Sequence, residues 1–165
     1  MDRTERNQKR LEEAQGYGEV WEIVKDNVQQ FLKQKRRGMM LFLDDMPLKL
    51  GAYHPVGTNN IVLNRALVRL VEGSTKSKKL VNAFVYTILL HEYLHALGYL
   101  RETEVRPLVF RISRSCFGEE HVATRLAKLG PWSLLQDLPV DTSKAPNRVM
   151  EIVKDFEKTN QRYIV

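Results

Sequence analysis

The most constraining feature of the sequence is one long stretch without a helix breaker. Residues 78–97 contain neither glycine nor proline, and from Leu80 onward apolar side chains occupy every direction around a helical wheel. A helix that is apolar on all sides is a buried one, so the rest of the chain must pack around it. Gly98 follows directly, at a position where glycine commonly ends a helix. The stretch therefore predicts a central, buried helix over residues 78–97.

Apolar patterns on either side of this stretch predict further helices and short strands. Apolar residues recur at three- and four-residue steps in several segments, as in amphipathic helices, and other runs have the length of strands. The predicted helices cover residues 19–35, 65–72, 103–116 and 119–129, with a last one that Pro146 opens and that carries Val149, Met150, Val153 and Phe156; the predicted strands lie at 39–43, 49–55 and 61–63. The prediction is an α+β fold, in which a small antiparallel or mixed sheet of three or four strands packs on the buried helix, with additional N- and C-terminal helices.

Length and composition predict one domain. A chain of 165 residues buries its own hydrophobic core, and we treat residues 1–165 as a single domain with residues 1–17 as a mobile, charged N-terminal segment. The single cysteine, Cys116, has no partner for an internal disulfide, which predicts a cytoplasmic protein. The N-terminus is charged and the longest apolar run, residues 83–90, is short, so we expect no insertion into a membrane.

The net charge bears on the choice of partner. A formal charge of +6 at pH 7 is compatible with nucleic acid as a partner. Much of the excess lies in two short basic clusters, at residues 33–37 and 76–79, and such clusters are typical of solvated helix ends and loops. Nucleic acid is therefore an alternative partner that the sequence does not favour.

Within the apolar stretch lies a polar island, His91-Glu92-Tyr93-Leu94-His95. A spacing of four residues places both imidazoles on one face of a helix, one turn apart, where they can share a metal ion. Polar groups without partners are costly in a buried helix, and a zinc ion would satisfy these two directly. The motif therefore predicts one Zn²⁺ ion held by His91 and His95.

Residues 91–98 resemble the active-site helix of the zincin zinc metallopeptidases, in which His-Glu-x-x-His is followed by a glycine turn. The chain as a whole is similar to small predicted archaeal metallopeptidases of this type. The resemblance implies a zincin-like fold, hydrolysis of peptide bonds, and a peptide or protein substrate. It also implies that an edge strand near residues 50–53 or 61–63 lines the substrate cleft.

The resemblance gives Glu92 a defined role. With three protein ligands, zinc keeps a fourth position for a water whose pKa falls towards about 7. Glu92 would accept the proton of this water as general base and return it to the leaving amine. Tyr99 and His54 are candidate helpers for the oxyanion, and their ordinary alternatives are a packing residue at the cleft rim and a loop histidine.

The third metal ligand stays open among Glu102, Glu104 and His121. Metzincins have a histidine three residues after the glycine, where this chain has Arg101, and gluzincins use a glutamate from a following helix. The chain turns close to the metal after the motif, so Glu102 and Glu104 begin near it. A helix over residues 103–116 would carry the chain on the order of 20 Å away before His121. Glu102 is ranked first, Glu104 second and His121 third.

Two other functions compete with the peptidase. His91-x-x-x-His95-x-x-Gly98-Tyr99 also resembles the metal-dependent endoribonucleases that process ribosomal RNA, whose motif ends in a third histidine where Arg101 stands. The other alternative is a non-catalytic module on the same fold that binds zinc or nucleic acid. The presence of Glu92 counts against both, and structural zinc sites are more often closed by four protein ligands.

Overall fold

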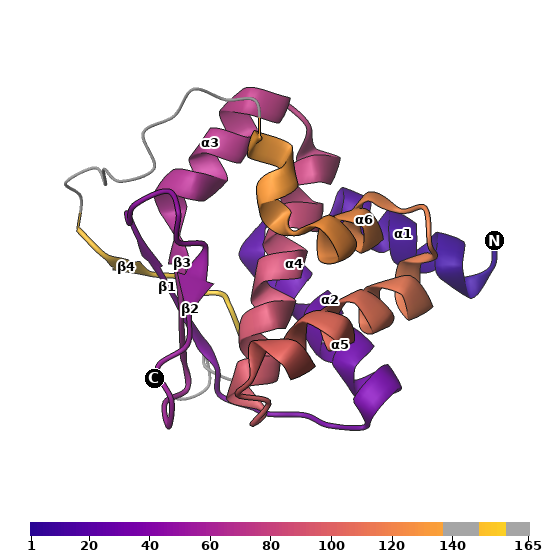
Figure 1. Ribbon diagram of the computed structural model, residues 1–165, viewed down its shortest axis with the longest axis horizontal. Coiled ribbons are helices and arrows are strands. Elements are labelled where there is room, and N and C mark those ends of the chain that lie inside the picture. Colours follow the sequence, from indigo (N-terminus) through magenta and orange to yellow (C-terminus); the bar gives the residue numbers. More distant parts are fainter. Residues whose placement is uncertain (137–148, 158–165) are drawn as a thin grey trace.

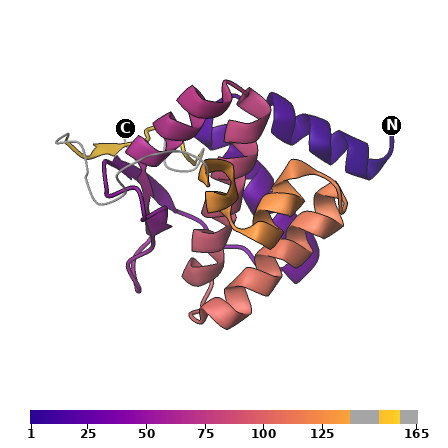
Figure 2. The same cartoon turned by 45° about the horizontal axis from the view of Figure 1, so that its top comes forward.

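The apolar stretch of the sequence forms α4 (Lys78–Ala96), and the other elements surround it in the computed structural model (Figure 1). The structure describes residues 1–136 and 149–157. Thirteen residues of α4 are buried, which confirms the prediction of a central helix. The sheet lies on one side of α4, and α5 and α6 lie on another (Figure 2).

Four of the predicted helices outside α4 are present, and an additional helix precedes them. Two helices precede the first strand, one lies between the third strand and α4, and two follow α4. They are α1 (Arg3–Glu13), α2 (Gly16–Leu32), α3 (Arg65–Thr75), α5 (Glu102–Phe117) and α6 (Val122–Leu129), and a 3-10 helix, η1 (Pro131–Leu135), comes after α6. The helix predicted over residues 65–72 extends beyond Gly73, and the left-handed residue at its end is Lys76.

A small mixed sheet packs beside α4. Its strands are β1 (Met40–Asp44), β2 (Ala52–Tyr53), β3 (Asn60–Asn64) and β4 (Glu151–Ile152), in the order β2-β3-β1-β4. β1 and β3 are parallel, and the outer strands β2 and β4 are antiparallel to their neighbours. The protein is thus α+β with a mixed sheet, as the sequence predicts, and β2 forms one of the two edges of the described sheet.

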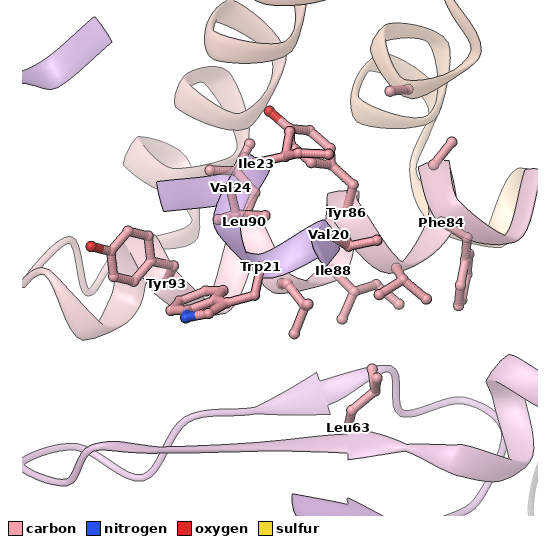
Figure 3. Close-up of a cluster of buried hydrophobic side chains, with 14 of the residues drawn as sticks. Val20, Trp21, Ile23, Val24, Leu63, Phe84, Tyr86, Ile88, Leu90 and Tyr93 are labelled. Atoms are coloured by element: carbon pink, nitrogen blue, oxygen red, sulfur yellow. The ribbon is translucent and has the colours of Figure 1, made fainter. Parts of the chain in front are cut away.

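The core lies between α2, α4 and the sheet. Figure 3 shows side chains of α2 and α4 directed toward one another, with Leu63 of β3 pointing to them from the sheet. Trp21 is fully buried, and its ring meets Tyr93 edge-on at 4.7 Å and stacks on Phe156 at 4.6 Å. Burial of a large apolar side chain stabilises a fold by about 1.5 to 3 kcal/mol, so this cluster holds α4 firmly in place.

The N-terminal segment is not the mobile tail that its charge predicts. It forms α1, which begins with a capping box between Asp2 and Glu5. Leu11 is fully buried, and the side chain of Asn7 donates a hydrogen bond of 2.9 Å to the carbonyl of Cys116 at the end of α5. Charge alone suggested solvation, whereas the cap and one buried leucine anchor the helix.

The last predicted helix is also wrong where the structure describes it. Pro146, which was to open it, lies outside the described residues, and residues 151–152 form β4 beside β1. Phe156, whose spacing suggested a helix, stacks on Trp21 in the core. The Glu157 carboxylate accepts a hydrogen bond of 2.7 Å from the N–H of Met39. Pairing with an open strand has outweighed the helical periodicity.

In the described part of the chain, no helix combines the length and the apolar character needed to cross a membrane.

Candidate metal centre

His91 and His95 lie on the last two turns of α4. The four-residue spacing brings their rings to 4.9 Å between centroids, with the two Nε2 atoms 3.2 Å apart. Both side chains are half-buried, on a helix of which most other residues are fully buried. The shared face that the sequence predicts is therefore present.

The chain turns sharply after α4 and returns with Glu102. Gly98 has φ +109, in the left-handed region that favours glycine, and its N–H donates to the carbonyl of His95 at 3.0 Å. α5 then begins at Glu102, whose Oε1 lies 3.1 Å from Nε2 of His91 and 2.8 Å from Nε2 of His95. The residue ranked first as third ligand is thus the one that lies beside both imidazoles.

The backbone of Tyr99 sets the orientation of His95. The Tyr99 N–H donates back to the carbonyl of Leu94 at 3.1 Å, which fixes the turn. Nδ1 of His95 lies 2.8 Å from the Tyr99 carbonyl, an oxygen that can only accept. In its neutral form His95 therefore carries its proton on Nδ1 and presents a bare Nε2 lone pair to the cluster.

This tautomer leaves an unbalanced contact. The Nε2 lone pair of His95 faces Oε1 of Glu102 at 2.8 Å and Nε2 of His91 at 3.2 Å. In its neutral form, His91 can carry at most one proton on its Nε2, so the three atoms share no more than one proton. A cation shared by the three atoms would balance the contact, and the three ligand atoms lie within 4.8 Å of one another.

Electrostatics favour the metal-binding protonation states. Burial lowers the pKa of His91 below its ordinary value, and the nearby Glu102 offsets this only in part. Partial burial by itself would raise the pKa of Glu102, but the two imidazoles outweigh it, so that this pKa is lowered. A neutral imidazole and an ionised carboxylate are the forms that bind a divalent metal.

Glu92 lies beside the cluster and has a different environment. Glu92 is 7% exposed, and its side chain has no hydrogen-bond partner among residues 1–136 and 149–157. Burial raises the pKa of Glu92 to about 7, although His95 opposes the effect. A carboxylate with such a pKa exchanges protons readily near neutral pH.

The cluster opens into a cleft of about 720 Å³ between the sheet edge and the later helices. His91 and Glu92 lie along one wall with Ile88, and Glu102 lies on the wall formed by α5. Gly51 and Ala52 bring the edge of the sheet to the cleft. A Cβ at Gly51 would lie 3.5 Å from Cδ1 of Ile88, so the sheet edge approaches α4 closely here.

Arg36 secures the end of α4 that carries the site. Its guanidinium donates to the carbonyl of Ala96 at 2.5 Å and to that of Thr58 at 2.9 Å. Its backbone N–H donates to the hydroxyl of Tyr93 at 2.8 Å. Satisfying a free carbonyl at the helix end joins α4 to the loop before β3, and this fixes the position of His95.

The other predicted site residues lie elsewhere. Glu104 is exposed, and its nearest charged partner is Arg101 at 3.9 Å. His121 caps the start of α6 and lies 3.3 Å from Glu12. The Tyr99 hydroxyl donates to Gln34, and His54 bonds through Nδ1 to the carbonyl of Asn60 at 2.8 Å. The described residues that line the cleft include none of these four.

The sequence did not predict several of the residues that line the cleft. They are Lys49, Arg106 and Lys128, which bring positive charge, and Trp132 on η1. Only Arg106 had a local signal, because it stands four residues after Glu102 on the same helix, and its Nε lies 3.4 Å from Oε2 of that glutamate. The orienting role of the Tyr99 carbonyl was also missed, since any residue type supplies it.

Comparison of the chain with protein-family models, curated proteins and solved structures gave no match.

Proposed function

We propose that the protein is a zinc-dependent metallopeptidase of the zincin type. The observation that carries the proposal is the convergence of Nε2 of His91, Nε2 of His95 and Oε1 of Glu102 on one point at the wall of a cleft. Two imidazoles and one carboxylate are a donor set typical of catalytic zinc, which keeps a further position open. A buried glutamate adjacent to the first histidine completes the set of groups that hydrolysis requires.

The donor atoms fit a divalent cation better than they fit protons alone. The His95 tautomer imposed by the Tyr99 carbonyl leaves a lone pair facing a carboxylate oxygen at 2.8 Å. The side chains of His91, His95 and Glu102 are 27%, 16% and 50% exposed, so a metal ion can reach them from solvent. His91, His95 and Glu102 would hold the ion.

When bound, zinc supplies a Lewis acid that polarises the scissile carbonyl and makes water more acidic. The Glu92 carboxylate accepts a proton from the attacking water and passes it to the nitrogen of the leaving amine, so that water is consumed and an acid and an amine are formed. In the metal-free site, burial raises the pKa of Glu92 to about 7, the range of a group that both accepts and returns protons at neutral pH. The low exposure of Glu92 keeps bulk water from competing for the proton.

The arrangement around the site supports the zincin assignment of the fold. A mixed sheet precedes the motif helix, its edge strand β2 borders the cleft, and the chain turns at Gly98 before the third candidate ligand. β2 lies at an edge of the sheet and β3 does not, which supports the first of the two segments that the resemblance left open.

Two features weigh against the alternative functions. The position that would carry a third histidine in the ribonucleases holds Arg101, and the neighbouring Glu102 occupies the place beside the two imidazoles. A purely structural zinc site needs no buried carboxylate in the position of Glu92 and is more often closed by a fourth protein ligand.

Metal content and hydrolysis test the proposal together. The chain is stripped with a chelator and reloaded with zinc, and zinc per chain is measured by mass spectrometry, alongside cleavage of labelled casein and of a single-stranded RNA. Wild type should take up one zinc and cleave casein, and Glu92→Gln should keep the zinc and lose cleavage by a factor of about 100 to 10,000. The matched control, Glu104→Gln, should retain both.

Wild-type protein that takes up no zinc would refute the proposal. Full casein cleavage by Glu92→Gln would refute the role of this carboxylate, and cleavage of RNA without cleavage of casein would favour the ribonuclease.

A further inference from the structure

The charges that line the cleft are distributed unevenly. Its acidic side chains are Glu92 and Glu102, and both have assigned roles in the proposed reaction. Its basic side chains are Lys49 on the sheet side, with Arg106 and Lys128 on the helix side. Once a metal takes up the charge of Glu102, the remaining groups give the cleft a positive potential, which attracts anionic partners.

Two of these cations are free to meet a ligand. Lys49 and Lys128 are exposed, and neither forms an ion pair within residues 1–136 and 149–157. Arg106 is 77% exposed and lies 3.4 Å from the Glu102 carboxylate, so it too keeps donors directed to solvent. The three cations come from different elements, since Lys49 lies before β2, Arg106 on α5 and Lys128 on α6.

The cleft also has an apolar lining. Ile88, Phe110, Leu126, Pro131 and Trp132 contribute to it, and Trp132 is 37% exposed. A wall of aliphatic and aromatic side chains favours a bulky apolar group on the ligand. Nucleic acid would be better served by a row of cations that follows the phosphates and by several aromatic platforms for bases.

The sheet edge suits an extended polypeptide. β2 pairs with β3 on one side, and in the described part of the sheet no strand lies on its other side. Gly51 and Ala52 border the cleft at this edge. An extended segment can pair with such an edge through its backbone while its side chains meet the charged and apolar walls.

On the basis of the proposed peptidase function, we infer that the cleft selects polypeptide segments in which a bulky apolar residue is flanked by acidic side chains. The apolar side chain packs near Trp132. The flanking carboxylates meet Lys49 on one side and Lys128 and Arg106 on the other. Lys49 and Lys128 are therefore specificity-determining residues, and the reacting bond is left to the metal centre and Glu92.

Binding to an inactive protein tests this substrate class without relying on cleavage. The Glu92→Gln variant is prepared with and without zinc, and fluorescence anisotropy measures its affinity for a labelled peptide with glutamates around a central leucine and for the same peptide with glutamines. We expect the acidic peptide to bind about tenfold more tightly at low salt, and the difference to shrink in about 0.5 M NaCl.

Charge removal then locates the preference. In the same inactive background, Lys49→Gln with Lys128→Gln should reduce the difference between the two peptides to less than about threefold, whereas Lys9→Gln on α1 should leave it unchanged. Equal binding of both peptides by the unmodified cleft would overturn the inference, as would an undiminished preference in the double lysine variant. Tighter binding of a single-stranded RNA than of the acidic peptide would also overturn it.

The two proposals fail separately. Zinc uptake and casein cleavage decide the peptidase function, while the acidic preference depends on lysines that are not metal ligands and is measured in metal-free protein as well. A chain that binds zinc and cleaves casein but ignores the charge of the peptide would retain its proposed function and lose the inferred substrate class.

Discussion

Two contacts in this molecule bring histidine close to glutamate, and they differ in how the ring nitrogens are hydrogen-bonded. At the cleft, His91 and His95 present their Nε2 atoms to one oxygen of Glu102. Between α1 and α6, His121 accepts a hydrogen bond at Nδ1 from the N–H of Ala123 at 3.1 Å and lies 3.3 Å from Glu12 through Nε2. In the cleft, three acceptor atoms lie close together. At His121, each ring nitrogen has a separate partner, the N–H of Ala123 or the Glu12 carboxylate.

The difference lies in the second nitrogen of each ring. Neutral His95 donates its Nδ1 proton to the Tyr99 carbonyl, so its Nε2 faces the Glu102 carboxylate with a lone pair. His121 uses its lone pair to cap α6, so its proton points toward Glu12, in a close contact that is not a well-aligned hydrogen bond. The proposal of a metal centre therefore rests on which ring nitrogen carries the proton, rather than on the closeness of histidine to glutamate.

The largest effect should separate the two contacts by metal affinity. His91→Ala or His95→Ala should weaken zinc binding by about a thousandfold, because a binding free energy of about 10 to 16 kcal/mol in small zinc sites is shared among few ligands. His121→Asn should bind zinc as wild type does. Competition with a chromophoric chelator measures the affinities, and equal losses in all three variants would erase the distinction.

The next effect should distinguish two neighbouring glutamates. Glu102→Gln removes the charged ligand while keeping the shape of the side chain, and should weaken zinc binding by about a hundredfold. Glu104→Gln, two residues away and exposed, should change it by less than about twofold. The same chelator titration applies. Loss of affinity in the Glu104 variant alone would move the third ligand to that residue.

A smaller effect should appear in stability rather than in metal binding. His121 is 6% exposed, caps α6 and stacks on Phe117, so His121→Ala should lower the free energy of unfolding by about 1 to 3 kcal/mol. His121→Asn should recover about 1 kcal/mol of this, since asparagine caps helices well. Urea denaturation in the presence of a chelator measures both variants. Wild-type stability in His121→Ala would remove its structural role.

The smallest effect concerns pH. Burial lowers the pKa of His121, so the unfolded chain takes up a proton at higher pH than the folded chain does. The contribution of His121 to stability is therefore fully present above about pH 6.5 and is lost as the pH decreases below it. His121→Asn should make the free energy of unfolding of metal-free protein depend less steeply on pH between about 5 and 6.5. An unchanged slope would show that this histidine does not titrate as its burial requires.

Prediction from the sequence succeeded where the signal was local. The apolar surround of α4, the strands near Leu41 and Val62, and the shared face of His91 and His95 all follow from short-range periodicity. The capping box at Asp2 and Glu5 was equally local and would have revealed α1, had its pattern been weighed against the charge of the segment.

Prediction failed where partners come from far along the chain. The spacing of Val149, Val153 and Phe156 suits a helix, but an open strand at β1 and the space beside Trp21 decided otherwise. Periodicity describes one segment at a time, and it contains no information about an unpaired edge contributed by residues more than a hundred positions earlier.

By itself, the sequence determined the buried helix and the two imidazoles that share one face of it, because both depend on angles that repeat every few residues. Which acid would meet those imidazoles was decided by the turn at Gly98 and the direction in which α5 leaves it. Tertiary structure alone placed Lys49, Lys128 and Trp132 around one cleft. Packing of separate elements creates such neighbours, and no spacing along the chain encodes them.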